Sequence, residues 1–180
     1  MRPVFWFVAL VAGAAMTVSA ASLTFATAIV GQNSPALVVP ELSGQDFDLA
    51  KLRGKVVIVN FWATWCPPCR KEMPALDAFY QRYRGQGLEM IGLSADRPRD
   101  RSDVLKVMQS FGYPAAMLDD AKVNGFGAPS VLPITFVVDR DGVVRAKLAP
   151  GETPLTEDSL AGVVLPLLRQ GTAAPAPAQK

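Results

Sequence analysis

The longest hydrophobic stretch of this chain lies at its start. No residue from Pro3 to Pro40 is charged, and Val4–Val30 is predominantly apolar after a single cation, Arg2. This run exceeds the roughly 7 to 15 residues of a signal-peptide core and reaches the roughly 20 residues that cross a bilayer as a helix. We therefore predict an uncleaved membrane anchor in residues 1–31, with its cationic end in the cytoplasm and the rest of the chain exported.

Two triplets of small residues keep a cleaved signal peptide open as the alternative. Val18-Ser19-Ala20 and Ala26-Thr27-Ala28 both resemble cleavage sites, and cleavage would release a soluble secreted form. A buried core helix is the weakest interpretation, because the run is longer than a domain of this size places in one element.

The remainder of the chain divides into a linker, one folded domain and a tail. Residues 32–41 are interpreted as a linker, and residues 42–170 as the folded domain. Residues 171–180 contain Ala-Pro repeats and are typical of a disordered tail, because they cannot bury enough apolar surface to become ordered. At roughly 150 residues per domain, a chain of 180 residues leaves no room for a second enzyme-sized domain.

Two continuous apolar runs inside this domain predict parallel strands that are covered on both faces. They are Lys55–Phe61 and Leu88–Ser94. Apolar residues recur between them at helical spacing, and Gly85 is expected to end this helix. Together the three segments predict a β-α-β unit with a right-handed crossover. The residues on the apolar face of the helix are Met73, Leu76, Phe79, Tyr80 and Tyr83.

The second half of the domain predicts two helices and a hairpin. Asp141-Gly142 indicates a tight turn between strands 134–138 and 143–148. Residues 42–52 are expected to form an extra hairpin before the first strand. One helix begins near Asp100, ends at Gly112 and has Val104, Leu105, Met108 and Phe111 on its buried face. The last helix buries Leu160, Val163, Val164, Leu167 and Leu168, and Pro166 is expected to kink it or end it early.

Composition excludes several kinds of chemistry. The net charge is only +2 and 19% of the residues are charged, so nucleic acid is not an expected partner. The chain has no histidine, which excludes a Ser-His-Asp triad, a Cys-His dyad, histidine-bound zinc and axial-histidine haem. The chemistry therefore depends on the two cysteines.

Cys66 and Cys69 lie three residues apart, where the predicted strand becomes the predicted helix. At this spacing the Cβ atoms are about 5 to 6 Å apart, so the pair can change between dithiol and disulfide. The helix N-terminus favours a thiolate, which makes Cys66 the predicted nucleophile and Cys69 the resolving thiol. Pro67 and Pro68 each remove an N–H, so the pKa of Cys66 should fall less than in a Cys-Pro-His-Cys site.

Two other uses of the cysteines remain open. A static disulfide would close a very short loop and would stabilise the fold poorly. A two-coordinate Cu(I) site, with Met73 as a third soft ligand, would make the chain a copper chaperone or metal tether. Such a protein would retain Cu(I) and fail to reduce disulfides. Structural zinc needs about four ligands, more than the chain offers.

Residues 59–74 read VNFWATWCPPCRKEMP and closely resemble the TlpA/ResA/DsbE-type membrane-tethered oxidoreductases of the thioredoxin superfamily. The resemblance covers about residues 42–168, through Phe47-Asp48-Leu49, residues 52–55 and residues 132–139. It implies an α/β thioredoxin fold with an added N-terminal hairpin and a central insert. It also implies a location at the bacterial inner membrane, with the domain facing the periplasm or cell exterior.

The same resemblance implies a chemistry and its partners. The activity is reduction of protein disulfides, often those of apocytochrome c before haem attachment, and it needs no cofactor beyond the Cys66-Cys69 pair. Because exported compartments are oxidising, such a reductase needs an upstream electron donor in the membrane. A peroxiredoxin is disfavoured, because its P-x-x-x-T-x-x-C pattern needs threonine at position 63, which is Ala63; Thr64 comes one residue too late.

Several site residues follow from the resemblance alone. Pro133 matches the family's cis-proline, which leaves the Leu132 backbone free to pair with a bound peptide; the alternative is an ordinary loop proline, because only about 5 to 6% of X-Pro bonds are cis. Glu72 matches an acidic residue that accepts or relays a proton for Cys69; its alternative role is to stabilise the first turn of the helix.

Aromatic and polar positions around the cysteines complete the resemblance. Trp62 and Trp65 match aromatic residues that surround the site, with ordinary packing as the alternative, and Trp65, Pro67 and Pro68 are expected beside the substrate. Asn60 stands where thioredoxin carries a buried aspartate, so that proton-relay group is absent here.

Overall fold

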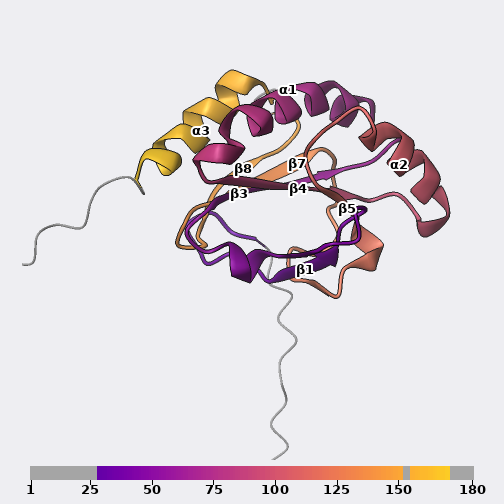
Figure 1. Ribbon diagram of the computed structural model, residues 1–180, viewed down its shortest axis with the longest axis horizontal. Coiled ribbons are helices and arrows are strands. Elements are labelled where there is room, and N and C mark those ends of the chain that lie inside the picture. Colours follow the sequence, from indigo (N-terminus) through magenta and orange to yellow (C-terminus); the bar gives the residue numbers. More distant parts are fainter. Residues whose placement is uncertain (1–27, 152–154, 171–180) are drawn as a thin grey trace, which may run out of the picture.

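A five-stranded sheet forms the centre of the fold in the computed structural model, which describes residues 28–151 and 155–170. Helices cover one face of this sheet and a small three-stranded sheet covers the other (Figure 1). The main sheet has the order β5-β4-β3-β7-β8, formed by β3 (Val56–Trp62), β4 (Leu88–Ser94), β5 (Ala115–Met117), β7 (Ile134–Val138) and β8 (Val144–Leu148). The small sheet has the order β2-β1-β6, formed by β1 (Leu37–Pro40), β2 (Asp46–Asp48) and β6 (Val123–Asn124). The α-helices are α1 (Pro67–Tyr83), α2 (Arg101–Met108) and α3 (Glu157–Arg169).

The central strand β3 confirms the prediction of a strand covered on both faces. All seven of its residues are buried. Val56, Ile58 and Trp62 belong to the core under the helices. Val57, Val59 and Phe61 belong to the core against the small sheet. The strand pairs in parallel with β4 and antiparallel with β7, so its carboxyl end lies between two neighbours.

Helix α1 follows β3 directly and confirms the predicted β-α-β unit. Its buried face includes most of the predicted apolar residues. The helix ends at Tyr83, and a short 3-10 helix, η2 (Arg84–Gln86), leads into β4. The chain reverses at Gly87, which has a φ of +93°. α1 thus ends directly before Gly85, as predicted, although Gly85 itself does not have a positive φ. The buried residues of α1 are Cys69, Met73, Leu76, Phe79 and Tyr80.

The segment predicted as a linker, residues 32–41, is part of the fold, and this prediction is wrong. Leu37 and Val39 of β1 are buried at 1% and 0% exposure, because they fill the core between the two sheets. Ahead of them, Asn33 pairs with Val143 beside β8. Ala28 is also buried. The folded part therefore begins before residue 42.

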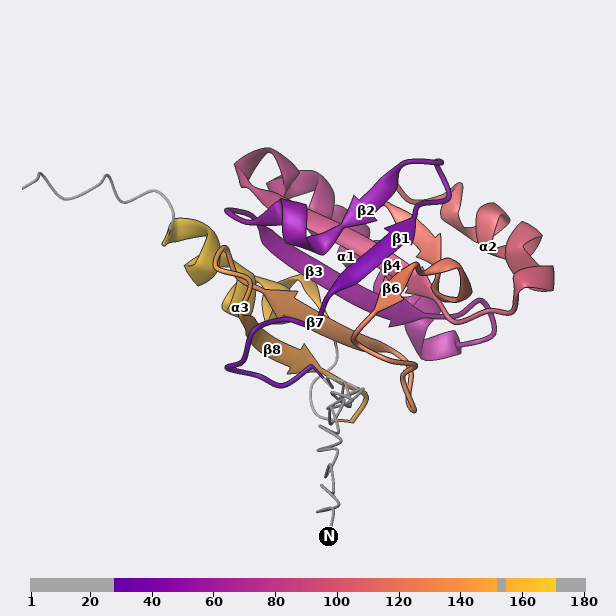
Figure 2. The same ribbon diagram turned by 90° about the horizontal axis from the view of Figure 1, so that it is seen from below.

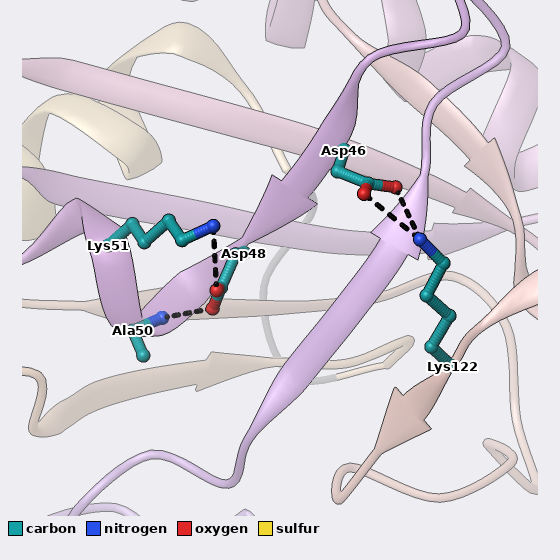
Figure 3. Close-up of polar contacts among 5 residues, drawn as sticks. All are labelled: Asp46, Asp48, Ala50, Lys51 and Lys122. Atoms are coloured by element: carbon teal, nitrogen blue, oxygen red, sulfur yellow. Dashed lines mark hydrogen bonds and ion pairs between the residues drawn. The ribbon is translucent and has the colours of Figure 1, made fainter.

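The N-terminal hairpin is also shifted from its predicted position. It consists of β1 and β2, with the turn at residues 41–45, and is followed by a 3-10 helix, η1 (Leu49–Leu52). Figure 3 shows the polar contacts that surround it. Lys122 binds both carboxylate oxygens of Asp46 at 2.9 Å. The Asp48 carboxylate accepts from the Ala50 N–H at 3.1 Å and so caps η1.

The central insert between β4 and β7 carries α2, β5 and β6. Helix α2 follows a 3-10 turn, η3 (Pro98–Asp100), and ends at Met108 rather than at Gly112. Val104 is buried as predicted, but Leu105 is 42% exposed, so the predicted buried face is partly wrong. Strand β5 was not predicted, since it has only three residues; it pairs in parallel with β4 at the edge of the main sheet. A last 3-10 turn, η4 (Leu118–Asp120), follows it.

The C-terminal elements confirm the predicted hairpin and correct the predicted helix. Strands β7 and β8 are antiparallel, and Gly142 in their turn has a φ of +74°. Helix α3 continues through Pro166 to Arg169, although Pro166 was expected to kink or end it. Proline is tolerated because its missing N–H would have bonded Gly162, which is exposed, so water can reach that carbonyl group.

Two predictions concern residues that the structure does not describe. Most of the predicted anchor or signal peptide, residues 1–31, lies before Ala28, and the predicted tail, residues 171–180, lies after Gln170. Within residues 28–151 and 155–170, no helix is both long enough and apolar enough to cross a membrane. Figure 2 shows the described elements from below, with the small sheet in front of the main sheet.

Candidate active site

Cys66 and Cys69 form a disulfide at the junction of β3 and α1. The two sulfur atoms are 2.07 Å apart, and the two Cα atoms are 5.3 Å apart. Cys66 is the N-cap residue of α1, and Cys69 lies in the first turn. Both are buried, at 5% and 1% exposure, so Cys66 offers more surface to solvent than Cys69. The spacing argument is therefore confirmed as far as disulfide closure is concerned.

The surroundings of the Cys66 sulfur offer few hydrogen-bond donors. The Cys69 N–H donates to Sγ of Cys66 at 3.3 Å. Pro67 and Pro68 occupy the first two helical positions and have no N–H to donate. Arg70, like its neighbour Lys71, is exposed, so solvent and salt screen its charge. One backbone amide and the helix dipole therefore provide the main stabilisation of a Cys66 thiolate.

A buried carboxylate lies beside the loop that precedes the cysteines. Asp96 is 2% exposed and follows β4. It accepts from the Thr64 N–H at 2.8 Å and from the Thr64 hydroxyl at 2.5 Å. Ser94 donates its hydroxyl to the same carboxylate at 2.7 Å. The sequence does not predict this cluster, because its residues are far apart in the chain; the only local signal is that Thr64 and Asp96 each lie two residues after a buried strand.

A groove runs beside the disulfide and brings together most of the predicted substrate-binding residues. Trp65, which lines the groove, is 66% exposed, and Leu132, in the loop before β7, lines the same groove. Trp62, in contrast, is completely buried in the core under the helices, so its packing alternative is confirmed. We call this feature the active-site groove; its lining is Trp65, Cys66, Pro67, Pro68, Ala95, Leu118, Asp119, Ala128, Pro129, Ser130, Val131 and Leu132.

Pro133 and Glu72 lie together in a second, smaller hollow. The Leu132–Pro133 peptide bond is cis, as the resemblance implied, and Pro133 is buried. Glu72 lines this hollow together with Pro133, Leu148 and Leu155, so the structure does not place it in the active-site groove. Burial raises the pKa of Glu72 above its ordinary value of 4.5, and a hydrogen bond from the Leu155 backbone partly opposes this effect.

The position that carries an aspartate in thioredoxin holds a neutral polar pair here. Asn60 is 1% exposed, and its Nδ2 donates to Oγ1 of Thr135 at 2.8 Å. Met73, the candidate third copper ligand, is completely buried in the core. Among the described residues, no group of three or more His, Cys, Asp or Glu side chains is arranged to hold a metal ion.

The arrangement of these elements is found in known proteins. Residues 30–147 match the AhpC/TSA family. The thiol-disulfide oxidoreductase ResA of Bacillus cereus is 36% identical over 124 residues, which cover 69% of this chain and 72% of that protein. ResA of Geobacillus thermodenitrificans is 35% identical over 140 residues, which cover 76% of this chain and 79% of that protein.

Solved structures agree with this relationship. A thiol:disulfide interchange protein of the thioredoxin family from Chlorobium tepidum has a TM-score of 0.62 and 27% identity, over 76% of this chain and 96% of that one. StoA from Bacillus subtilis has a TM-score of 0.60 over 73% of this chain and 98% of its own, and at 19% identity it supports the fold alone.

The fold and the disulfide define a thioredoxin-like α/β protein with a redox-active Cys-x-x-Cys site. The chain belongs to the AhpC/TSA family, and its ResA relatives show that it is a thiol-disulfide oxidoreductase. The predicted class of enzyme and the predicted thioredoxin-like fold are thus confirmed.

Proposed function

We propose that this protein is an exported, membrane-anchored oxidoreductase that works mainly as a reductase of protein disulfides. The observation that carries the proposal is the disulfide at the N-terminus of α1, beside an open groove. Cys66 is the cysteine that lines this groove, whereas Cys69 is buried behind it. A substrate disulfide therefore reaches Cys66 first.

The reaction proceeds through two exchanges between sulfur atoms. In the reduced protein, the Cys66 thiolate attacks one sulfur of a substrate disulfide; a mixed disulfide forms, and the other substrate sulfur leaves as a thiolate. Cys69 then attacks Sγ of Cys66, closes the Cys66–Cys69 disulfide and releases the second substrate thiolate. The two electrons that reduce the substrate come from the dithiol, and the released thiolates take up protons. The disulfide seen here is the product state of this cycle.

The active-site groove is proposed to hold the peptide that surrounds the substrate cysteine. Trp65 presents an exposed aromatic surface on one side of Cys66, and Pro67 and Pro68 continue the rim. Leu132, which also lines the groove, precedes the cis-proline Pro133 and is proposed to pair with the substrate through its backbone. These contacts would orient the substrate sulfur toward Cys66.

Glu72 is proposed to accept the proton that Cys69 loses when it attacks the mixed disulfide. A carboxylate whose pKa is raised by burial is a better proton acceptor than a fully solvated one. Glu72 follows Cys69 by three residues on α1, a spacing that places the two side chains on the same side of the helix.

The direction of electron flow is proposed from the N–H groups near Cys66. With two prolines at the start of α1, the Cys66 thiolate is stabilised less than in strong oxidants, which favours a reducing potential. Reduction in an oxidising compartment requires a dithiol donor in the membrane. Apocytochrome c, with two cysteines that must be reduced before haem attachment, is the proposed substrate at the bacterial inner membrane.

The proposal is tested with the reduced protein and a disulfide-containing peptide. We expect mass spectrometry after brief alkylation to find Cys66 modified before Cys69, and Cys69→Ala to trap a mixed disulfide on Cys66. Cys66→Ala serves as the matched control and should trap nothing. First modification of Cys69, or a trapped peptide in Cys66→Ala, would reverse the assigned roles.

A further inference from the structure

We infer that Asp96 is a positioning residue for Cys66 and acts through Thr64. The Asp96 carboxylate is almost completely buried and accepts from Thr64 twice, from its N–H at 2.8 Å and from its hydroxyl at 2.5 Å. A buried carboxylate that receives several hydrogen bonds is held in one orientation. The inference rests on the proposed role of Cys66 as the attacking thiol.

Asp96 is itself fixed by the end of β4. Ser94 donates its hydroxyl to Oδ2 of Asp96 at 2.7 Å, and its Oγ accepts from the Asp96 N–H at 3.1 Å. Ser94 is 0% exposed, so this small ring of hydrogen bonds is shielded from water. The carboxylate therefore holds Thr64, the residue that it binds, in a fixed position relative to the end of β4.

Thr64 connects this fixed point to the cysteine. The Cys66 N–H donates to the Ala63 carbonyl group at 3.2 Å, which closes a turn that contains Thr64. Just before that turn, the Ala95 N–H donates to the Trp62 carbonyl group at 2.8 Å and extends the pairing of β3 with β4. The turn is thus tied to β4 through both its backbone entry and the Thr64 side chain.

The position of this turn affects the Cys66 sulfur because that sulfur has few other partners. The Cys69 N–H donates to Sγ at 3.3 Å, and Pro67 and Pro68 cannot replace it. A turn that moves relative to α1 would misalign this hydrogen bond. Loss of the Thr64–Asp96 contact should therefore raise the pKa of the Cys66 thiol and slow its reactions.

The experiment compares Thr64→Val, which keeps the shape of the side chain but loses the hydroxyl, with Thr64→Ser, which keeps the hydroxyl. The rate of Cys66 alkylation is measured against pH in the reduced full-length protein. Thr64→Val should slow alkylation at pH 7 by about threefold or more, which corresponds to about half a pKa unit. Thr64→Ser should stay within about twofold of the parent protein.

A double-mutant cycle tests whether Thr64 acts through Asp96. In an Asp96→Ala background, which has no acceptor for the Thr64 hydroxyl, Thr64→Val should lose most of its effect on the logarithm of the rate; the charge removed from position 96 is the same in both members of that pair, so it cancels. Equal effects of Thr64→Val in both backgrounds would overturn the inference. So would an alkylation profile of Thr64→Val that superimposes on that of the parent protein.

Val104→Ala controls for general loss of stability. Val104 is completely buried on α2, and its truncation should lower the melting temperature without changing the alkylation profile. A shift in Val104→Ala equal to that in Thr64→Val would contradict a positioning role. The order in which Cys66 and Cys69 react is read from the parent protein alone, so a failure of the proposed function is distinguishable from a failure of this inference.

Discussion

Pro68 controls how many donors the Cys66 sulfur can have. As the second residue of α1 it has no N–H, and its side chain is exposed beside the groove. We predict that the protein equilibrates with glutathione at a potential nearer about −270 mV, the value of thioredoxin, than about −120 mV, the value of DsbA. Pro68→His should raise the potential, because it restores an N–H and adds a cation next to the sulfur.

Pro68→Ala is the matched control for this prediction. It restores the N–H without the cation, so its potential should lie between those of the parent protein and Pro68→His. The measurement is the fraction of disulfide at several ratios of reduced to oxidised glutathione. A parent potential near that of DsbA, or no upward shift in Pro68→His, would show that the prolines do not set the potential.

The catalytic role proposed for Glu72 and its effect on stability can be measured separately. Burial raises its folded pKa, so the stabilisation it provides is present below the ordinary pKa of 4.5 and is lost as pH rises through the folded value. At pH 7 the charged side chain therefore costs stability. Glu72→Gln should unfold at an equal or higher temperature at pH 7, while Cys69 resolves the mixed disulfide at least about tenfold more slowly.

The pH dependence of the resolution rate is a second test of the role of Glu72. The resolution rate of the parent protein should fall in acid with an apparent pKa above 4.5, and Glu72→Gln should lose this limb. Glu89→Gln, at a half-buried position in β4, is the control. Unchanged resolution in Glu72→Gln with a lower melting temperature would leave Glu72 with only a structural role. That role is not the predicted one at the start of the helix, because no acidic residue lies in the first turn of α1.

At the scale of elements, Asp139 stabilises the β7–β8 hairpin. Its carboxylate accepts from the Asp141 N–H at 3.0 Å, from the Val143 N–H at 2.8 Å and from Nε of Arg145 at 2.5 Å. Burial alone would raise the pKa of Asp139, but these hydrogen bonds and the Arg145 charge outweigh it, so the pKa lies below its ordinary value of 3.8.

Asp139→Asn should lower the free energy of unfolding at pH 7 by about 1 to 3 kcal/mol, because it weakens hydrogen bonds to a charged group. A lowered carboxyl pKa gives stability above the ordinary value of 3.8 that is lost as pH falls through the folded value. The variant should therefore lose less stability in acid than the parent protein. Asp141→Asn, exposed in the same turn, should change stability by less than about 0.5 kcal/mol; denaturant unfolding at pH 3 and pH 7 measures both.

The elements differ in how well the sequence predicts them. The sequence predicts β3 because a continuous β-branched run is typical of a buried parallel strand, and it predicts β4 from a similar, largely apolar run. Asp141-Gly142 predicts the β7–β8 hairpin from two neighbouring residues. The sequence of β1 indicates a linker, because two buried residues alternate with half-exposed ones over only four positions. The burial of β1 depends on the packing of the small sheet against the main sheet, and no local sequence pattern predicts that packing.

The features of the site also differ in how well the sequence predicts them. The cysteine spacing predicts the disulfide from neighbouring residues alone. The contacts of Asp96 with Thr64 and of Glu72 with Leu155 join segments that meet only after the sheet and helices have packed. A polar residue directly after a buried strand marks a candidate, but the sequence does not say what it binds.

At the scale of the whole molecule, the folded domain begins close to the apolar N-terminal run. Ala28 is 4% exposed and belongs to the core between the two sheets, and the Gly31 N–H donates to the Val144 carbonyl group at 2.8 Å. Residues 32–41, the predicted linker, are part of this packed fold. The described fold therefore has no long linker after Ala28.

This boundary discriminates between the two candidate cleavage sites. Cleavage after Ala28 would remove a residue that is 4% exposed in the core between the two sheets, and with it the apolar contacts that it makes there. Cleavage after Ala20 would leave the packed residues intact, and an uncleaved anchor would leave everything in place. The folded structure therefore disfavours the second site, although its residues fit a cleavage motif equally well.

We predict that the mature protein keeps its N-terminus and stays with the membrane. A compartment-sensitive reporter fused after Gln170 should be active only outside the cytoplasm, and intact-mass measurement should give the full-length chain in a fraction released by detergent but not by salt. A chain that begins at Ala21 would replace the anchor with a cleaved signal and leave the domain boundary unaffected. A chain that begins at Ile29 would contradict the boundary itself, because the domain would then fold without Ala28, and reporter activity only in the cytoplasm would contradict export.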